Sequence, residues 1–570
     1  MTDHRRERRR RFIRRALPAL AAVALVAGLI AGARSQPASM RVARSFGSAW
    51  ANGDTQRMYE LLTPEAQERT NGSAFAAAYR RDAATATVLG IRVARVRRRP
   101  GGAELEVVAR TRAFGTVRGP LEVPVRDGKI DWTRNMTFPG VPVGGVLARR
   151  TEAPRRAGIR ARDGRVIATG PAGARTQPLG AVAASVAGGL GRPPSQADSD
   201  ALYARGFPAE TPVGTSGLER LAETRLAGTP GGLLFGGGHV LAATRPRPAK
   251  AVRTTIDLDV QQAALTALAG RYGGVVALDP RTAQIRALAG IAFSGPQPPG
   301  STFKLVTATA VLQAHLATLS TPFPPATKAV IDGVDLENAN GESCGGTLAQ
   351  SFAKSCNSVF APLGVRVGAK RLVATAERYG WNRPPRLPGA APSTLPPASE
   401  ITSPLAVGSS AIGQGKVLAT PLQMASVAQT IAAGGVRTRP TIFPDARRKR
   451  TRVIPRRIAD QLEQLMIGVV AYGTGTAANL GAVKVAGKTG TAELTTTVKK
   501  DNEQTPPPEE QGVPAKPPGY DTDAWFTAYA PVRRPKIVAC VLIVHGGAGG
   551  STAAPAARLV LQAGLAASSD

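Results

Sequence analysis

Residues 298–316 read PPGSTFKLVTATAVLQAHL, a chain break followed by an apolar helix. The Pro-Pro-Gly ends the preceding segment, so we expect Ser301 to open the helix. Lys304 follows one turn later on the same face. A serine hydroxyl needs a base, and a lysine can be that base when burial or neighbouring cations lower its pKa. The stretch therefore predicts a serine nucleophile at a helix N-terminus, whose backbone donors could hold an oxyanion.

The same Ser-x-x-Lys spacing occurs a second time, at Ser351 and Lys354. Its pattern places that serine in the middle of a helix, with no turn before it. We interpret this copy as a chance match.

Two further motifs distinguish the first copy. They are Ser355-Cys356-Asn357 and Lys488-Thr489-Gly490-Thr491. The order Ser-x-x-Lys, Ser-x-Asn, Lys-Thr-Gly resembles that of the penicillin-binding proteins and serine β-lactamases. The resemblance covers residues 252–570 and is strengthened by TTIDLDVQ (254–261), IGQG (412–415), TPLQM (420–424) and WFTAYAP (525–531).

The resemblance implies a role for each motif residue. Ser301 would attack the carbonyl between the two D-alanines (D-Ala-D-Ala) of a peptidoglycan stem peptide, with Lys304 as the base. Ser355 would relay the proton to the leaving amine, and Asn357 would bind the substrate amide and hold Lys304. Lys488 would supply a positive field. The implied substrate-binding residues are Thr489, Gly490 and Thr491: the two hydroxyls would receive the terminal carboxylate, and the backbone amides of Ser301 and Thr491 would form the oxyanion hole.

The motifs leave the fate of the acyl-enzyme open. A β-lactamase must hydrolyse it, and in class A enzymes a glutamate upstream of Leu-Asn does so, whereas Glu400 is followed by Ile-Thr-Ser. A D,D-carboxypeptidase has the same motifs and differs in its acceptor. A β-lactam sensor would need an intracellular output domain, and an inert scaffold would not need three intact motifs. We expect a class B penicillin-binding protein, a D,D-transpeptidase that binds β-lactams, with a separate glycosyltransferase partner.

An uncharged run at residues 16–33 follows an arginine-rich start. At ~1.5 Å per residue it covers about 27 Å of a ~30 Å hydrocarbon core, so it can cross a lipid membrane once. The positive-inside rule leaves residues 1–15 as a cytoplasmic basic tail and the rest outside. A cleaved signal peptide is the alternative, because residues 31–33 are small. We expect an uncleaved single-pass anchor in the cell membrane.

The formal charge is +34, with dense basic runs at residues 5–15, 97–99 and 447–452. There is no basic helix interleaved with aromatic residues, and no nucleic-acid motif, so an anionic cell envelope is a better partner than nucleic acid. With three cysteines and no pair of Cys-x-x-C type at zinc spacing, we expect no metal and no cofactor.

The cysteines leave one alternative open. Cys344 and Cys356 could form a disulfide outside the cell or stay free thiols, and Cys540 is expected in a buried strand. The Pro-rich, polar stretch 498–521 predicts a mobile flap.

Residues 38–147 are predicted to form an α+β domain. Helical patterns at 40–50, 55–62 and 73–81 precede three strand-like runs, separated by turns at 100–102 and 127–128. The segment resembles the NTF2-like domain of certain penicillin-binding proteins. It lacks a cluster of His, Asp and Tyr, so we interpret it as a spacer or interaction domain.

The remainder divides into two predicted domains. Residues 148–250 resemble the dimerisation-like pedestal of class B penicillin-binding proteins through RRAGIRARDGRVIA at 155–168, although Ala157 and Ala161 depart from the family pattern. Residues 252–570 would form the transpeptidase domain, a sheet covered by helices. Its expected elements are a helix capped by Asp257, two strands around a turn at 279–280, two strands near the C-terminus and a final helix over 554–567. The predicted fold class is α+β.

Overall fold

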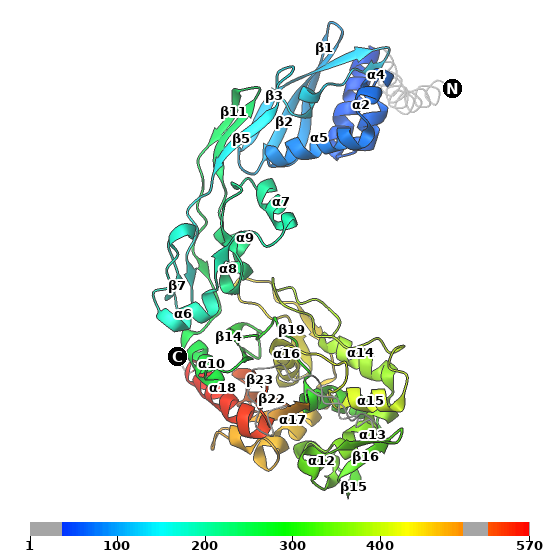
Figure 1. The fold of residues 1–570 in the computed structure, drawn as a ribbon, viewed down its shortest axis with the longest axis vertical. Helices are drawn as coiled ribbons and strands as arrows, with labels where there is room; N and C mark the ends of the chain where they lie inside the picture. Colours follow the sequence, from blue (N-terminus) through cyan, green and yellow to red (C-terminus); the bar gives the residue numbers. More distant parts are fainter. Residues whose placement is uncertain (1–36, 494–521, 569–570) are drawn as a thin grey trace, which may run out of the picture. The chain divides into compact units, whose positions relative to one another are not determined.

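The computed structural model describes residues 37–493 and 522–568 (Figure 1). The predicted anchor (16–33) and the predicted flap (498–521) lie outside these residues. Within the described ranges, no helix combines the length and the apolar character that crossing a membrane requires.

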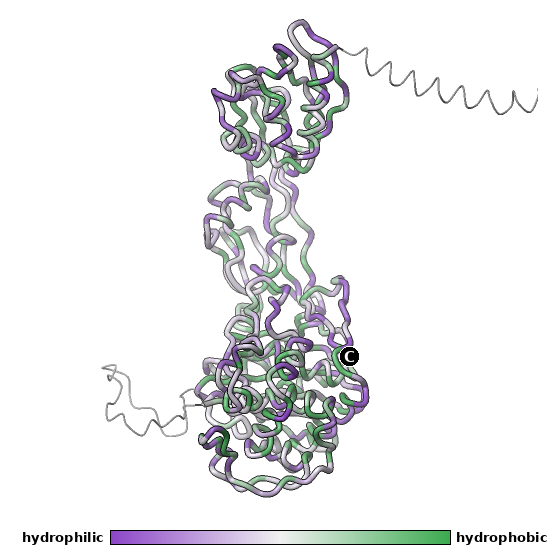
Figure 2. Tube along the Cα trace, turned by 90° about the vertical axis from the view of Figure 1, so that its right-hand side faces the viewer, coloured by the Kyte–Doolittle hydropathy of each residue, from purple (hydrophilic) through white to green (hydrophobic). Residues whose placement is uncertain are grey.

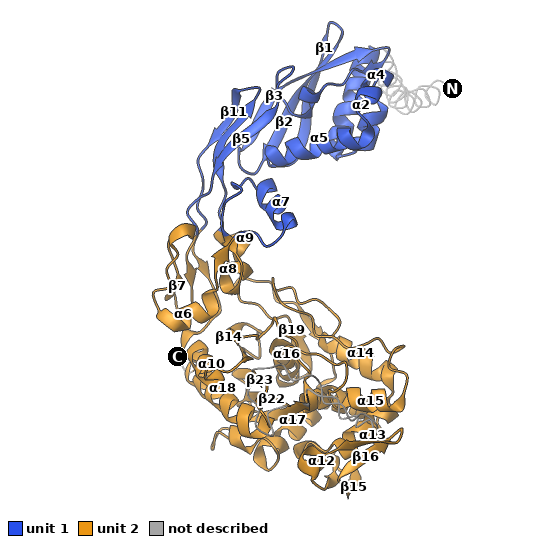
Figure 3. Ribbon diagram, in the orientation of Figure 1, with its two compact units in different colours: residues 1–156, 192–212, 227–249 blue, residues 157–191, 213–226, 250–570 orange. Residues whose placement is uncertain are grey.

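The chain forms two compact units, each built from segments that are not contiguous in sequence (Figure 3). Of the described residues, the first unit contains 37–156, 192–212 and 227–249, and the second contains the others. Residues 148–250, predicted as one domain, contribute elements to both units. In each unit, hydrophobic and hydrophilic residues alternate along the chain, as expected for elements that bury one side (Figure 2).

The first unit begins with helices that pack on an antiparallel sheet, as predicted. The helices are α2 (Ala38–Asn52), α3 (Thr55–Glu60), α4 (Pro64–Arg69) and α5 (Gly72–Thr85), and the sheet has the order β1 (Val88–Arg99), β2 (Gly102–Thr111), β3 (Thr116–Arg126), β4 (Lys129–Ile130). Phe46 of α2, Phe75 of α5 and Leu105 of β2 are fully buried in one hydrophobic core. The predicted turn at Asp127 and Gly128 joins β3 to β4 with positive φ at both residues (51° and 72°), the geometry of a type I′ hairpin.

A second sheet completes the first unit. Its order is β11 (His239–Thr244), β10 (Gly231–Gly236), β5 (Leu147–Glu152), and α7 (Gln196–Ala204) belongs to the same unit. The guanidinium of Arg149 lies 3.7 Å from the ring centroid of Tyr203 and donates to the Tyr203 carbonyl (2.6 Å), so it attaches α7 to β5.

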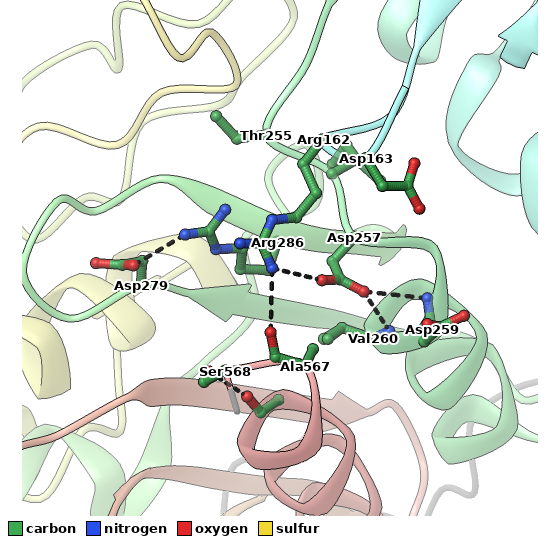
Figure 4. A network of polar contacts seen from close by, with 12 residues as sticks. Arg162, Asp163, Thr255, Asp257, Asp259, Val260, Asp279, Arg286, Ala567 and Ser568 are labelled. Atoms are coloured by element: carbon green, nitrogen blue, oxygen red, sulfur yellow. Dashed lines mark hydrogen bonds and ion pairs between the residues drawn. The ribbon is translucent and has the colours of Figure 1, made fainter. Parts of the chain in front are cut away.

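The second unit opens with a small subdomain that contains the RARDG turn. Its elements are β6 (Ile159–Arg160), β7 (Val166–Ala168), α6 (Gly180–Ala187), β8 (Leu190–Gly191), β9 (Val213–Gly214), α8 (Gly217–Leu221), α9 (Glu223–Leu226) and β12 (Val252–Arg253). Arg162 donates to the Asp257 carboxylate (2.9 Å) and to the Ala567 carbonyl (3.3 Å) (Figure 4). Arg165 pairs with Asp163 at 2.6 Å. The turn therefore makes ion pairs although Ala161 departs from the family pattern.

The second unit is built around a five-stranded antiparallel sheet. Its order is β14 (Ile285–Gly290), β13 (Gly273–Leu278), β23 (Ile537–Ile543), β22 (Thr522–Ala530), β21 (Ala486–Glu493). Phe526 packs in the core with α10 (Leu258–Leu268) and α18 (Ala554–Ala566). The next residue, Thr527, donates to the Met424 carbonyl (3.2 Å) of α16 (Pro421–Ala432). Because neighbouring strand residues point to opposite faces, helices cover both faces, as predicted.

The remaining elements of the second unit surround the site described below. The helices are α11 (Lys304–Gln313), α12 (Leu348–Ala353), α13 (Asn357–Val367), α14 (Ala369–Tyr379), α15 (Pro404–Ala411) and α17 (Arg456–Ala471). Short strand pairs are β15 (Pro322–Ala326) with β18 (Cys344–Thr347), β16 (Lys328–Ile331) with β17 (Val334–Glu337), and β19 (Val436–Thr438) with β20 (Arg450–Arg452). The predicted helix capped by Asp257 is α10. The Asp257 carboxylate accepts hydrogen bonds from the Asp259 and Val260 amides (3.2 and 3.3 Å).

Candidate active site

Ser301 lies in a tight 3₁₀ turn, Gly300–Phe303, and α11 begins only at Lys304. The sequence predicted an α-helix from Ser301. The difference follows from close backbone packing: the Gly300 amide donates to the Gly413 carbonyl (3.0 Å), and a Cβ on Gly300 would lie 2.6 Å from the Thr491 carbonyl oxygen. With φ of +48°, Gly300 adopts a conformation that other residues avoid. The turn therefore sits directly against β21.

Lys304 is fully buried and meets the second motif. Its Nζ donates to Asn357 Oδ1 (2.7 Å) and to the Ser355 carbonyl (2.5 Å), and lies 3.4 Å from Ser355 Oγ. Burial, and secondly the positive charge of Lys488, hold the pKa of Lys304 well below its usual range. A neutral amine can accept a proton, which is the property that a base for Ser301 requires. The Ser301 hydroxyl itself makes no hydrogen bond within the described chain.

Ser355 lies at the junction between α12 and α13 with a φ of +65°. The following residue, Cys356, caps α13 and forms a disulfide with Cys344 of β18. The sequence left this pairing open. The bridge attaches the junction to a neighbouring strand, while Cys540 stays a buried free thiol whose pKa burial raises.

Lys488 is also fully buried. Its Nζ donates to Ser355 Oγ (2.8 Å) and to the Thr489 carbonyl (3.1 Å). Burial lowers its pKa to about 7, so near neutral pH it is only partly charged. The positive field expected of Lys488 is therefore complete only below that pH. The hydrogen bonds of Lys304, Ser355 and Lys488 within the described chain involve no carboxylate.

The three residues after Lys488 differ in their surroundings. Thr489 Oγ1 lies 2.6 Å from Thr474 Oγ1, and Thr491 Oγ1 accepts from the Gly549 amide at 3.3 Å. Gly490 has a packing role, since a Cβ there would lie 2.7 Å from the Pro299 carbonyl oxygen and 3.0 Å from Thr302 Cγ2.

Thr474 is a site residue that the sequence analysis missed. Besides its contact with Thr489, its amide donates to the Ala353 carbonyl (3.1 Å) at the end of α12. Thr474 therefore connects the end of α12 with Thr489 of β21. Its place in Gly473-Thr474-Gly475, shortly before β21, is the only sequence signal for it.

Two residues that the sequence excluded as a nucleophile and as a deacylating base lie apart from this group. Ser351 is buried within α12, so the second Ser-x-x-Lys copy does not open a helix. Glu400 is exposed in a turn, where its amide donates to the Pro397 carbonyl (2.9 Å).

Comparison with known proteins agrees with this geometry. The model described as penicillin binding protein transpeptidase domain matches residues 273–562. The chain is 33% identical over 387 residues to peptidoglycan D,D-transpeptidase PbpA of Mycobacterium tuberculosis strain H37Rv, covering 55% of this chain and 72% of that protein. It is 32% identical over 422 residues to PbpA of Mycolicibacterium smegmatis, covering 62% of this chain and 80% of that protein.

Solved structures show the same mixed α/β transpeptidase fold. The penicillin G acyl-enzyme complex of penicillin-binding protein A from M. tuberculosis superposes with a TM-score of 0.56 and 29% identity, covering 72% of this chain and 99% of that chain. A D,D-transpeptidase domain of a peptidoglycan glycosyltransferase from Eggerthella lenta gives a TM-score of 0.57 and 28% identity, covering 72% and 98%.

Proposed function

Because this chain belongs to the penicillin-binding protein transpeptidase family, we propose that Ser301 is the nucleophile through which it works as a peptidoglycan D,D-transpeptidase. The enzyme cross-links stem peptides through an acyl-serine intermediate and binds penicillin covalently. The observation that carries the assignment of residues is the hydrogen-bonded group of Lys304, Ser355, Asn357 and Lys488 one helical turn from Ser301.

In acylation, Ser301 Oγ bonds to the carbonyl carbon between the two D-alanines, and its proton passes to the neutral amine of Lys304. The backbone amides of Ser301 and Thr491 hold the oxyanion. The C–N bond then breaks, and the leaving D-alanine amine takes a proton through the Ser355 hydroxyl, which the Lys304 ammonium resupplies.

In the second half-reaction, an amine of a neighbouring stem peptide attacks the ester carbonyl. The bond to Ser301 Oγ breaks, the amide cross-link forms, and the proton of the attacking amine returns to the serine oxygen. Asn357 binds the donor amide in both half-reactions. The hydroxyls of Thr489 and Thr491 receive the donor's terminal carboxylate in the first half-reaction only, because that carboxylate leaves with the D-alanine. A β-lactam follows the first half-reaction only, because its leaving amine stays tethered.

Labelling with a fluorescent penicillin tests the nucleophile. Ser301→Ala abolishes labelling, because no ester can form. Ser351→Ala is the matched control from the second Ser-x-x-Lys copy and keeps full labelling. Labelling that survives Ser301→Ala would contradict the assignment.

Nitrocefin separates a transpeptidase from a β-lactamase. Deacylation by water needs a second base, whose contribution is commonly ~10²–10⁴ in rate. Since no carboxylate belongs to the hydrogen-bonded group around Lys304 in the described chain, we expect a stoichiometric burst followed by almost no turnover. Steady turnover that Ser301→Ala removes would make the enzyme a β-lactamase.

Muropeptide mapping after incubation with lipid-linked disaccharide pentapeptide and a polymerase separates cross-linking from D,D-carboxypeptidase activity.

We also propose that residues 16–33 anchor the enzyme in the cell membrane, with the catalytic unit outside and a separate glycosyltransferase as partner. The charge asymmetry around the apolar run supports this topology, and residues 38–147 would act as an NTF2-like spacer or interaction domain. A reporter that is active only outside the cytoplasm, fused after residue 40, is expected to be on; release of the mature chain into the medium would favour a cleaved signal peptide.

A further inference from the structure

The segment from residue 437 to residue 452, which contains β19 and β20, has a strong excess of positive charge. Its only acidic residue is Asp445, and its basic residues are Arg437, Arg439, Arg447, Arg448, Lys449, Arg450 and Arg452. The transpeptidation mechanism uses none of them.

Asp445 does not neutralise this segment. Its two carboxylate oxygens accept from Arg225 (2.9 and 3.0 Å), whose guanidinium also lies 4.0 Å from the ring centroid of Phe443. The one carboxylate of the segment is therefore already paired with a cation from outside it.

Arg437 is the residue of this segment that most clearly lacks a partner. Its Nε is buried and has no hydrogen-bond acceptor. Its guanidinium packs against Gly380, the residue that caps the C-terminal end of α14. Burial, followed by repulsion from Arg383 and Arg439, lowers the pKa of Arg437.

The described part of the chain offers these three arginines no counter-charge. None of them forms an ion pair with a described residue, and no carboxylate acts on the pKa of Arg437. The C-terminal end of α14, beside Gly380, carries a partial negative charge, yet Arg437 donates no hydrogen bond to it within the described residues. A buried guanidinium nitrogen without an acceptor is unfavourable, and an oxyanion bound to the partly exposed Arg437 guanidinium would offset part of that penalty.

We propose that Arg383, Arg437 and Arg439 form a binding site for a phosphate group that carries more than one negative charge, such as a diphosphate or a phosphomonoester. The Arg437 guanidinium lies at Gly380, three residues before Arg383, and Arg439 follows Arg437 by two residues. Three neighbouring arginines carry more charge than a single carboxylate neutralises, and the planar donor fork of arginine fits phosphate oxygens. The basic residues 447–450 raise the local concentration of such anions. This site is separate from the transpeptidase residues, so its test is independent of the reaction.

Isothermal titration of the full-length chain in neutral detergent with inorganic pyrophosphate tests the site. We expect saturable binding with one site per chain, weakened at least 10-fold by Arg437→Gln and also by Arg439→Gln. The matched control is Arg558→Gln on α18, which removes one exposed positive charge elsewhere in the same unit and leaves the affinity unchanged. Stoichiometric penicillin labelling of each variant verifies that it is folded.

A second titration with soluble dihexanoyl phosphatidic acid identifies the source of the phosphate. Tighter binding of the lipid than of pyrophosphate, lost in Arg437→Gln, assigns a phosphomonoester headgroup; tighter binding of pyrophosphate assigns a soluble diphosphate. Absence of saturable binding for both probes, or equal weakening by Arg558→Gln and Arg437→Gln, would overturn the proposal.

Discussion

Two lysine amines, Lys304 and Lys488, approach the same hydroxyl, Ser355 Oγ, in a buried environment. Neither has a carboxylate partner in the described chain, so burial and mutual repulsion both disfavour two positive charges there. The pKa of Lys488 is about 7 and that of Lys304 lies well below its usual range. The pair thus keeps one amine neutral and able to accept the serine proton. Burying these amines without a counter-charge lowers the folding stability.

That cost makes stability depend on pH. In the unfolded chain Lys488 keeps its ordinary pKa of 10.5, so between about pH 7 and pH 10.5 the unfolded state binds more protons than the folded state. Stability conferred by this group therefore rises with pH across that window. We expect the unfolding free energy, measured with urea, to rise more from pH 7 to pH 9.5 in the wild type than in Lys488→Met.

Lys370→Met is the control, because this exposed lysine lies outside the site on α14. It should keep the wild-type dependence on pH. Identical pH slopes for the wild type and Lys488→Met would show that the folded state does not depress the pKa of Lys488.

The three motifs come from three elements: the turn before α11, the junction of α12 with α13, and strand β21. Backbone contacts, a disulfide and side-chain hydrogen bonds hold them together. Gly300 and Gly490 allow the turn to touch β21, while the disulfide of Cys356 attaches the junction to β18. Thr474 connects the end of α12 with β21 through Ala353 and Thr489.

We expect Thr474→Val to lower the second-order rate of acylation by penicillin roughly 3- to 10-fold, because a lost hydrogen bond of this kind is worth about 0.5–1.5 kcal/mol. The cause is a Thr489 hydroxyl that is no longer oriented for the substrate carboxylate. Thr474→Ser keeps the hydroxyl and restores the rate. The second-order constant combines the dissociation constant of the non-covalent complex with the rate of acylation, and the effect should appear in the dissociation constant, measured by stopped-flow fluorescence.

Thr476→Val provides the matched control two residues further on, where the threonine is exposed. It should acylate at the wild-type rate. A normal rate in Thr474→Val would mean that Thr489 needs no such support.

At the scale of the molecule, the catalytic unit includes residues 157–191 and 213–226, far upstream of the transpeptidase motifs. Arg162 of this upstream part binds Asp257 and the Ala567 carbonyl, and Ser185 accepts from Gln261 of α10 at 3.1 Å. Within the same part, Arg175 and Glu219 form a buried ion pair at 2.7 Å. The catalytic fold is therefore supported by residues outside 252–570.

We expect a fragment of residues 252–570 to melt well below a fragment of residues 37–570, because it leaves Asp257 unpaired and exposes the surface that the upstream part covers. Since a change of 1 kcal/mol shifts the melting temperature by about 2–4 °C in a domain of roughly 150–250 residues and by somewhat less in a larger one, the loss of this part-buried pair and its packing should be measurable by calorimetry. In the longer fragment, Arg162→Gln should account for part of the difference. Equal melting temperatures would show that residues 252–570 fold without upstream support.

Local patterns were sufficient for much of this protein. Ser301, Lys304 and the two later motifs are recognisable because their spacing is short and their order is informative. The elements α2, α5, α10, β13, β22 and β23 follow from hydrophobic periodicity and capping, which neighbouring residues determine. The sequence alone therefore indicated the expected nucleophile and the elements of the catalytic sheet, and its resemblance to the penicillin-binding proteins indicated the fold class and the reaction type.

The tertiary structure decided what depends on residues distant in sequence. The pKa values of Lys304 and Lys488 depend on burial and mutual distance, the pairing of Cys344 with Cys356 on the placement of β18, and the contact of Thr474 with Thr489 on the packing of α17 beside β21. The tertiary structure also shows that each compact unit is built from segments that are separate in the sequence. Spacing along a chain cannot predict such features, because burial and hydrogen-bond partners are set only when distant segments pack together.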